Sequence, residues 1–347
     1  MGTVRIDQWP QTFETKGQRI LDAALDAGVP FPHGCGTGEC GSCKCQVLSG
    51  EVTMEKHSPL ALTPEEREEG KILACRSKAD GDIALRWLNN PSIIYPVLKF
   101  KSRVLSASKV AHDVVAVEVA VPEGVCFEYH PGQFAKLRFP GLPARSYSMA
   151  TARAEGKLSF HMRIVPNGQV SQFVASALEP GETVEVQGPF GEAHWEPHHA
   201  SEGGPLLLLG GGTGLAPMLS VLEAALMQGV PGEQIHLYHG VRGQRDLYAY
   251  EYLKKIVETR GITFVPVLSD DGFCDIPARA GMLHEAVAED HADLSGASVF
   301  VAGPPPMVEA AKSLAKSRGA VDERVRADPF FAAENQKRSI WARLTGW

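Results

Sequence analysis

The chain has 347 residues, enough for two or three domains that each bury a hydrophobic core. Hydrophobic residues make up 44% and charged residues 22%, as in ordinary globular proteins, and the net charge of −7 argues against nucleic acids and anionic membranes as partners. The longest strongly apolar run, Leu206 to Leu209, is far too short to cross a bilayer, and the first residues lack the apolar segment of a signal peptide. Seven cysteines suit a reducing compartment, so the sequence predicts a cytoplasmic protein.

About the first ninety residues predict a small domain in which two hairpins pack on a helix. Residues 3–6 and 11–14 alternate between apolar and polar side chains, which predicts the strands of an opening hairpin. Apolar residues recur at helical spacing over 20–25, and residues 46–52 predict a strand, a turn and a second strand. Thr63, which a proline follows, is the type of residue that begins a short helix.

Three cysteines in a glycine-rich loop, Cys35, Cys40 and Cys43, follow C-x4-C-x2-C spacing, and Cys75 comes later. This spacing is typical of the plant-type [2Fe–2S] site, in which four thiolates hold two irons. A four-cysteine zinc site usually has two C-x2-C pairs, and only one is present here; disulfides are disfavoured because nothing marks the chain as secreted. The other three cysteines are expected to be small buried apolar residues: Cys45, Cys126 and Cys274.

The middle of the chain predicts a small β-barrel. Residues 89–96 form a linker in this interpretation, because asparagines and prolines there interrupt both helical and strand patterns. From Phe100 onward, strand-like runs alternate with turn residues, and one short helix is expected near 171–177. The clearest strand-like runs are 114–121, 134–139, 158–165 and 183–187.

The last third predicts a parallel sheet covered by helices. Four consecutive leucines, 206–209, read as a buried strand, and the glycine-rich loop 210–214 leads into a helix over 217–228. Strands and helices then alternate, which favours a doubly wound sheet. The further strands are expected at 235–238, 263–268 and 298–301, and the further helices at 248–259, 282–288 and 306–317.

The segment Arg145-Ser146-Tyr147-Ser148, with Pro131–Phe134 before it and His161–Arg163 and Gly168–Ser171 after it, resembles the flavin domain of the ferredoxin–NADP reductase superfamily. The resemblance implies that Arg145 pairs with the flavin diphosphate, a bidentate contact that guanidinium suits, that Tyr147 packs on the flavin ring, and that Ser148 lies near its reactive nitrogen. A diphosphate site at a helix N-terminus favours FAD over FMN. The further residues expected at the flavin are His161, Arg163, Val165, Gly168, Gln169, Val170 and Ser171. For His161 a packing role, and for Arg163 an exposed strand position, stay open.

The glycine-rich loop is not a strict G-x-G-x-x-G, but a loop between a buried strand and a helix presents amides to a diphosphate. Together with Tyr238–Arg242, Asp246–Tyr248 and Gly303–Met307 it resembles the nicotinamide domain of the same superfamily. The resemblance implies dinucleotide contacts at these residues: Gly212, Thr213, Gly214, Arg242, Asp246, Gly303 and Pro304. Arg242 and Arg245 could meet a 2′-phosphate and Asp246 would not, and the arrangement looks more like the NADH-using members.

One position departs from the superfamily. A cysteine near the reacting carbon often precedes the glycine of the glycine–proline run, and this chain has Ala302 there. Hydride transfer is still expected, since the flavin and the nicotinamide carry out the chemistry.

In this order, the three segments resemble the benzoate-dioxygenase-reductase type of electron-transfer component over nearly the whole chain. The resemblance implies a multidomain protein of α+β and α/β class. It has a β-grasp [2Fe–2S] ferredoxin domain over 1–92, a flavin domain with a six-stranded antiparallel β-barrel over 99–200, and a nicotinamide domain with a doubly wound parallel sheet over 203–332. The sequence indicates no partner for the tail over 333–347.

The implied reaction moves electrons from NADH to FAD, from FAD to the [2Fe–2S] cluster, and then to a terminal oxygenase. This acceptor would belong to an aromatic ring-hydroxylating dioxygenase or a di-iron monooxygenase system, docking near the cluster loop at Glu39. A cytochrome P450, a sugar-deoxygenation enzyme or a non-catalytic redox sensor are alternatives, although a sensor needs no hydride source. In related reductases an aromatic residue near the end of the third domain covers the flavin. The resemblance therefore implies a catalytic position for Phe330 or Phe331. A role as a hydrophobic anchor for the last strand is an equally good interpretation.

Overall fold

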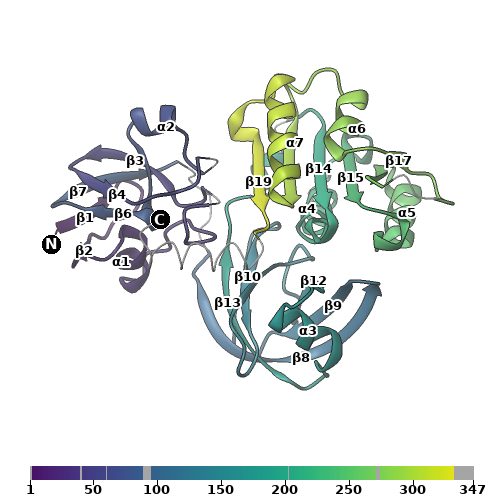
Figure 1. Ribbon diagram of the computed structural model, residues 1–347, viewed down its shortest axis with the longest axis horizontal. Helices are drawn as coiled ribbons and strands as arrows, with labels where there is room; N and C mark the ends of the chain where they lie inside the picture. The colour runs from purple at the N-terminus through teal and green to yellow at the C-terminus, as the bar shows by residue number, and fades with distance from the viewer. Residues whose placement is uncertain are drawn as a thin grey trace. The chain divides into compact units, whose positions relative to one another are not determined.

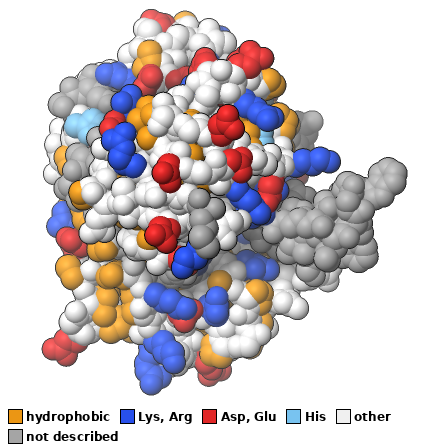
Figure 2. Space-filling model, turned by 90° about the vertical axis from the view of Figure 1, so that its left-hand side faces the viewer, with side chains coloured by type: hydrophobic (Ala, Val, Ile, Leu, Met, Phe, Trp, Pro, Cys, Tyr) orange, Lys and Arg blue, Asp and Glu red, His pale blue; other side chains and the backbone are white. Residues whose placement is uncertain are grey.

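The computed structural model describes residues 2–39, 41–59, 61–88, 95–201, 203–270 and 274–331. The chain divides into two compact units: Met1–Val97 with Phe190–Glu192, and Leu98–Pro189 with Ala193–Phe331. Within the described ranges, no helix is both long and apolar enough to cross a membrane. On the face drawn in Figure 2, acidic and basic side chains are interspersed rather than gathered by sign.

The first unit has a mixed sheet of five strands in the order β2-β1-β7-β3-β5, and β1 runs parallel to β7 (Figure 1). Helix α1 buries Ile20, Leu21 and Ala24 in the same core as Val4 and Leu85 of the sheet. A mixed sheet that packs on one helix in this way is a β-grasp arrangement, as expected. The elements are β1 Gly2–Ile6, β2 Phe13–Thr15, α1 Ile20–Asp26, β3 Lys44–Ser49, β4 Val52–Met54, α2 Pro64–Glu68, β5 Lys71–Leu73, η1 Ala74–Arg76, β6 Ser77–Ala79 and β7 Ile83–Trp87.

Strands β3 and β4 do not form the expected second hairpin, and that prediction was wrong. β3 pairs with β7 and β5, whereas β4 pairs with β6 in a separate two-stranded sheet. Gly50 between them has φ +89°, and a Cβ there would lie 2.4 Å from the carbonyl oxygen of Asp82. The chain therefore turns away at a close backbone contact that the strand pattern does not reveal. Thr63 does begin α2, since its hydroxyl accepts a hydrogen bond from the amide of Glu66.

The second unit begins with a six-stranded sheet in the order β11-β10-β13-β8-β9-β12, whose pairs β8–β9, β8–β13, β9–β12 and β10–β11 are antiparallel. A bridge between Met149, directly after β11, and Phe160 in β12 joins the two edges, so the sheet closes as a barrel. Its elements are β8 Leu98–Ala111, β9 Val114–Ala120, β10 Phe134–Arg138, β11 Arg145–Ser148, β12 Lys157–Arg163, α3 Gln169–Ser176 and β13 Thr183–Phe190.

A parallel sheet in the order β17-β16-β15-β14-β18-β19 completes the second unit, with helices between its strands (Figure 1). The chain starts at β14 in the middle, builds one side through β15 to β17 and then the other through β18 and β19. Ligands bind at such a switch point, beyond the carboxyl ends of the strands. The elements are η2 Pro197–Ser201, β14 Leu206–Gly211, η3 Gly212–Gly214, α4 Leu215–Met227, η4 Gly232–Gln234, β15 Ile235–Val241, η5 Gln244–Asp246, α5 Tyr250–Arg260, β16 Thr263–Leu268, β17 Arg279–Ala280, α6 Leu283–Asp290, β18 Ser298–Gly303, α7 Pro305–Ser317, η6 Asp322–Arg324 and β19 Val325–Pro329.

The four leucines of β14 explain why this strand is central. Leu206 and Leu208 belong to the core on one face of the sheet, while Leu207 and Leu209 belong to the core on the other. Because side chains alternate between the faces of a strand, a continuous apolar run is what a strand covered on both sides requires. The glycines that follow are thereby fixed at the carboxyl end of the sheet.

Candidate functional site

The cysteine loop connects α1 to β3 and directs backbone amides at its sulfurs. The amides of Thr37 and Glu39 each donate to the Sγ of Cys35 at 3.3 Å, and the amide of Cys75 donates to the Sγ of Cys43 at 3.5 Å. Such donors stabilise thiolates and tune the potential of an iron–sulfur cluster. The residues therefore fit a [2Fe–2S] cluster, although Cys40 lies outside the described residues.

The glycines of this loop are needed for its shape. Gly36 and Gly38 have φ of +70° and +79°, and a Cβ on Gly38 would lie 2.6 Å from the Cγ of Arg76. A loop that keeps returning to the left-handed region can bring amides of neighbouring residues onto one sulfur. This is the local reason for the G-x-G pattern between the first two cysteines.

The three cysteines outside the cluster pattern differ from one another. Cys45 is fully buried, and burial, followed by the neighbouring Cys75, raises the pKa of its thiol, so it packs as a neutral side chain. Cys274 is half-buried, and its thiol donates to the carbonyl of Ile276 at 3.3 Å. Cys126 is exposed, so the prediction that it is buried was wrong. The apolar residues around it in the sequence belong to a loop, for which strand periodicity gives no inward direction.

Strand β11 presents the Arg-Ser-Tyr-Ser segment at the edge of the barrel. Arg145 and Tyr147 are half-buried, Ser146 is exposed and Ser148 is buried. Burial raises the pKa of Tyr147 to about 12, and the neighbouring guanidinium of Arg145 acts in the opposite direction. The phenol is therefore neutral near pH 7 and lies beside a cation. A neutral aromatic ring suits the flavin ring, and the guanidinium suits the diphosphate.

The start of α3 forms a tight turn after β12. The hydroxyl of Ser171 accepts from the amide of Val165 at 3.0 Å and lies 3.2 Å from the carbonyl of Gly168, to which it can donate. The predicted anion contacts at this turn therefore fall to the backbone amides of Gln169 and Val170, which have no acceptor within the helix. The side chain of Ser171 serves the turn itself.

Two other residues predicted at the flavin lie where the barrel meets the parallel sheet. The ring of His161 packs edge-on against Tyr248 at 5.1 Å, and burial lowers the pKa of His161 to about 4. The Nε of Arg163 donates to Asp113 at 2.9 Å, and its Nη1 lies 3.6 Å from where a Cβ of Gly212 would be. Arg163 thus lies beside the glycine loop of the sheet.

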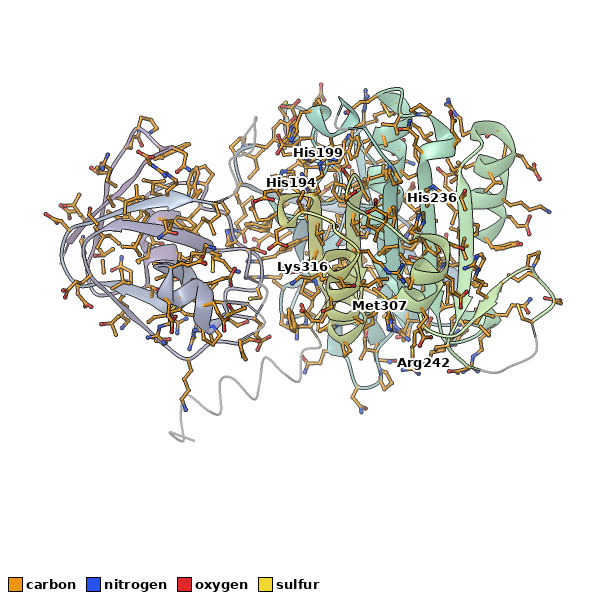
Figure 3. All side chains as sticks on the ribbon, turned by 90° about the horizontal axis from the view of Figure 1, so that it is seen from above. His194, His199, His236, Arg242, Met307 and Lys316 are labelled. Atoms are coloured by element: carbon orange, nitrogen blue, oxygen red, sulfur yellow. The ribbon has the colours of Figure 1, made fainter. Side chains whose placement is uncertain are left out.

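A pocket of about 200 Å³ opens at the carboxyl ends of the central parallel strands. Five of the predicted dinucleotide residues and Arg163 are brought together in it: Gly212, Thr213, Arg242, Asp246, Pro304 and Arg163. Figure 3 labels two residues of its wall, Arg242 after β15 and Met307 on α7. Glycine amides, a cation and a carboxylate within one cavity have the donors and acceptors that a nicotinamide dinucleotide needs.

Gly214 and Gly303 do not line this pocket but allow close packing around it. A Cβ on Gly214 would lie 2.0 Å from the carbonyl oxygen of Ala302, and one on Gly303 would lie 2.9 Å from that of Gly211. His239 holds the same loop, because its Nε2 lies 3.1 Å from the carbonyl of Gly212. Burial lowers the pKa of His239 to about 4, so the ring is neutral and donates through Nε2.

Sequence reasoning missed several residues of the pocket wall, above all Asp113. It lies with His112 in the two-residue turn between β8 and β9, far before the parallel sheet, which begins at Leu206. The sequence signals the turn, since it separates two strand-like runs, but carries no signal that the turn reaches the dinucleotide pocket. Met282 and Leu283, at the start of α6, are missed for the same reason.

The end of β19 lies beside β18 near the pocket. Asp328 pairs in register with Ala302, and burial raises the pKa of Asp328 to about 7. The amide of Phe330 donates to the carbonyl of Gly303 at 2.7 Å, and its half-buried side chain packs against the core of the sheet. An anchoring role is therefore evident for Phe330, and its place over the flavin stays a prediction.

The folds and sites define an oxidoreductase with three redox groups: a ferredoxin-type cluster, a flavin and a nicotinamide. Three family models match in the same order. They are the 2Fe-2S iron-sulfur cluster binding domain over residues 4–80, the oxidoreductase FAD-binding domain over 101–195 and the oxidoreductase NAD-binding domain over 208–313. The protein is thus an NAD(P)H-dependent iron–sulfur flavoprotein that uses a [2Fe–2S] cluster and FAD.

The chain is similar over nearly its full length to known reductases. It is 38% identical to the reductase subunit of an aromatic O-demethylase from an Amycolatopsis species, across 91% of this chain and 95% of the relative. It is 33% identical to the reductase component of the naphthalene 1,2-dioxygenase system of Pseudomonas putida, across 91% and 94%. The crystal structure of an Amycolatopsis cytochrome P450 reductase matches with a TM-score of 0.80 and 35% identity, across 96% of this chain and all of that chain. The chain belongs to the family of reductase components that supply oxygenase systems with electrons, which confirms the resemblance noted in the sequence.

Proposed function

We propose that this protein oxidises NADH in the cytoplasm and passes the electrons one at a time to the oxygenase component of a multicomponent system. The observation that carries this proposal is one chain holding both a cysteine loop with amide–sulfur hydrogen bonds and a dinucleotide pocket at the switch point of a parallel sheet. When bound, FAD takes up two electrons as a hydride and can release them singly, and the cluster carries one electron. Cys35, Cys40, Cys43 and Cys75 would hold that cluster.

In the barrel, the residues of β11 orient the flavin. Arg145 would contact the diphosphate, together with the first amides of α3 at Gln169 and Val170. Tyr147, whose phenol is neutral, would pack its ring against the flavin ring. Ser148 is buried, and its hydroxyl would lie near the reactive nitrogen of the flavin, where it could donate a hydrogen bond.

In the parallel sheet, the pocket residues orient NADH. The glycine loop at Gly212 and Thr213 offers amides to the diphosphate, and Pro304 borders the nicotinamide. Asp246 accepts the amide of Gly243 at 2.9 Å, which fixes its carboxylate in the pocket wall. A fixed carboxylate accepts hydrogen bonds from ribose hydroxyls and repels a 2′-phosphate, which supports NADH over NADPH.

The acceptor is proposed as the terminal oxygenase of a ring-hydroxylating dioxygenase or a di-iron monooxygenase. A cytochrome P450 is the second candidate, because the match to a cytochrome P450 reductase covers both chains almost completely. Docking near the cluster loop is expected for either acceptor, since electrons leave from the cluster. Glu39 is half-buried there, and burial, followed by the charge of Cys35, raises the pKa of its carboxyl group.

An anaerobic titration of the purified protein with NADH tests the electron chain. We expect both the flavin and the iron–sulfur absorption bands to bleach, with about three electrons taken up by the two groups. Bleaching of the flavin alone at normal iron content would disprove transfer to the cluster. A colourless but folded protein would disprove the proposed function itself.

The acceptor is tested by turnover with three purified partners: a Rieske dioxygenase, a di-iron hydroxylase and a cytochrome P450, each with its own substrate. NADH-driven product formation with one of the first two supports the main proposal. Product with the P450 alone would replace it with the second candidate. Reduction of cytochrome c without product from any oxygenase would point to another acceptor.

A further inference from the structure

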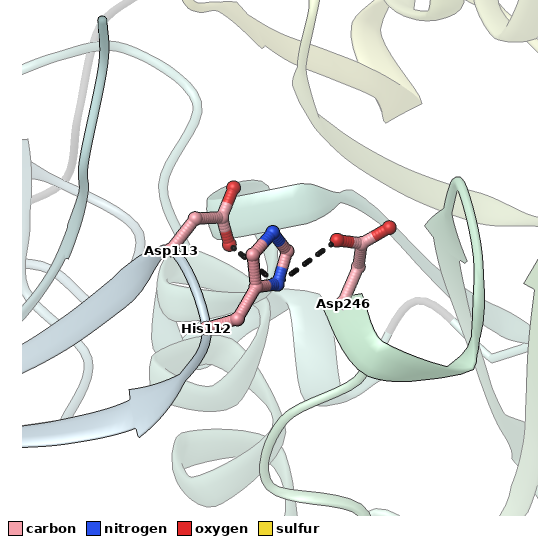
Figure 4. A group of neighbouring side chains, drawn as sticks. All are labelled: His112, Asp113 and Asp246. Carbon is pink, nitrogen blue, oxygen red and sulfur yellow. Dashed lines mark ion pairs between the residues drawn. The ribbon is translucent and has the colours of Figure 1, made fainter.

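The two-residue turn between β8 and β9 reaches from the barrel to the dinucleotide pocket of the same unit. The turn consists of His112 and Asp113, and the Nδ1 of His112 lies 3.8 Å from the Oδ1 of Asp113 and 3.3 Å from the Oδ1 of Asp246 (Figure 4). Asp113 also lines the pocket, together with Val114. Each residue of the turn contacts a different charged side chain of the pocket wall, one from the barrel and one from the parallel sheet.

Asp113 holds the guanidinium of Arg163. The Nε of Arg163 donates to the carboxylate of Asp113 at 2.9 Å, with the two side chains 40% and 18% exposed. The remaining guanidinium nitrogens can then face the pocket, and Nη1 approaches the place where a Cβ of Gly212 would be, to 3.6 Å. The pair therefore points a cation at the loop whose amides suit a diphosphate.

His112 contacts Asp246 and the backbone directly before it. Its Nδ1 lies 3.2 Å from the carbonyl oxygen of Arg245 and 3.3 Å from the Oδ1 of Asp246. Both neighbours accept hydrogen bonds, so the Nδ1 carries a proton and donates. The other carboxylate oxygen of Asp246 accepts the amide of Gly243 at 2.9 Å, which leaves the carboxylate clamped between its own loop and the barrel.

The same three side chains have the composition of a metal site, with ligand atoms within 4.8 Å of one another. Their protein contacts favour a different role. Asp113 is engaged by Arg163, Asp246 by the amide of Gly243, and the Nδ1 of His112 carries the proton that a metal ion would displace.

We propose that the His112–Asp113 turn is a positioning element for the nicotinamide dinucleotide: Asp113 aims Arg163 at the diphosphate, and His112 fixes Asp246 beside the ribose hydroxyls. Arg163, expected from the sequence at the flavin, then serves the dinucleotide. The turn makes the barrel a part of the nicotinamide site, although the site's glycine loop belongs to the parallel sheet. The inference rests on the proposed function, because it takes this pocket to be the NADH site.

The first experiment measures KM and kcat for NADH with ferricyanide as acceptor, using the FAD-loaded, cluster-loaded full chain. Asp113→Ala should raise KM for NADH about tenfold, a loss of about 1.4 kcal/mol, with kcat changing much less. Asp113→Asn, which can still accept from the Nε of Arg163, should recover most of that loss. Lys109→Ala, at an exposed position of the same hairpin, is the matched control and should behave as the wild type.

A double-mutant cycle separates positioning from general damage. Arg163→Gln should raise KM as much as Asp113→Ala, and the double variant should be no worse than Arg163→Gln alone. Additive losses, or an unchanged KM in Asp113→Ala, would overturn the role of Asp113. If Asp113→Ala does not fold, Asp113→Asn and Arg163→Gln still test the proposal. Equal KM values for NADH in the wild type and in Arg163→Gln would overturn it.

The role of His112 has its own measurement, the ratio of kcat/KM for NADH to that for NADPH. His112→Ala should lower this ratio about threefold because Asp246 is released, and His112→Asn, which keeps a donor, should restore it. If His112→Ala leaves the ratio unchanged, His112 has no role in positioning Asp246. If the ratio of the wild type changes when EDTA or Zn²⁺ is added, the three side chains form a metal site instead. A wild type that fails to oxidise NADH would instead refute the proposed function.

Discussion

The cysteine loop and the dinucleotide pocket are assembled in opposite ways. The loop is nearly contiguous in sequence, from His33 to Cys43, and the sulfur of Cys35 accepts hydrogen bonds from amides two and four residues further on. The pocket draws Asp113 from a turn of the barrel, Gly212 from the end of β14 and Asp246 from the segment after β15. Its charged side chains are oriented partly by contacts between residues far apart in the sequence, as Asp246 is by His112.

This difference decides what each site depends on. The cluster needs three thiolates and a left-handed backbone from the loop itself, and only the fourth thiolate, Cys75, comes from another segment. The pocket needs two sheets to pack correctly, since Arg163 and Asp246 are fixed by residues of the turn at His112 and Asp113. A change in the loop should therefore stay local, whereas the pocket should respond to changes far away in the sequence.

The largest expected effect separates the two sites completely. Cys43→Ala should remove the cluster and reduce NADH-driven electron transfer to the oxygenase at least about 100-fold, because a thiolate ligand is lost. Ferricyanide reduction through the flavin should keep its KM for NADH, since the pocket is untouched. Iron content, visible spectra and the two activities measure this.

The matched control is Cys45→Ala, two residues away, where a fully buried neutral thiol is replaced. This variant should keep its iron and its cluster bands. If Cys45→Ala lost the cluster while Cys43→Ala kept it, the assignment of the ligands from their spacing would be wrong.

Those parts of the fold that depend on neighbouring residues could be predicted from the sequence. The cysteine spacing, the leucine run of β14 with its glycine loop, and Thr63 at the start of α2 each carry their signal within a few residues. The physical reason is that loop conformation, strand burial and helix capping are local requirements.

The features that could not be predicted depend on pairing across the chain. The sequence around Gly50 does not reveal that β4 pairs with β6 rather than with β3, because the chain turns there at a contact with the distant Asp82. The sequence also does not reveal that Arg163 meets Asp113, which requires β12 to pair with β9, or that His112 reaches Asp246, which requires the barrel to pack on the parallel sheet.

Alanine substitutions of one glycine beside the pocket and one in the cluster loop should have intermediate effects on stability. In Gly214→Ala the new Cβ would meet the backbone of Ala302 at 2.0 Å, so α4 must move away from β18; we expect about 3 kcal/mol of lost stability and a higher KM for NADH. In Gly38→Ala the strain of φ +79° and a contact at 2.6 Å with the flexible side chain of Arg76 should cost about 1–2 kcal/mol. Denaturant unfolding followed by flavin fluorescence and by cluster absorption measures both, and a larger loss in Gly38→Ala would contradict this order.

The smallest expected effect is an acid response of the pocket. Burial lowers the pKa of His239 to about 4 in the folded protein, whereas an unfolded histidine titrates near 6.5. The unfolded state therefore binds a proton first as the pH falls, so the stability that the neutral ring contributes is complete above pH ~6.5 and is lost progressively down to pH ~4. His161, with a pKa of about 4, acts in the same direction. His239→Gln keeps a donor for the carbonyl of Gly212 but does not titrate. Its free energy of unfolding, measured in urea, should therefore fall less between pH 7.5 and pH 5 than that of the wild type, by about 2 kcal/mol at most. Equal losses in the two proteins would show that the ring of His239 gains a proton without unfolding, and the glycine loop would then be held by a contact that survives protonation.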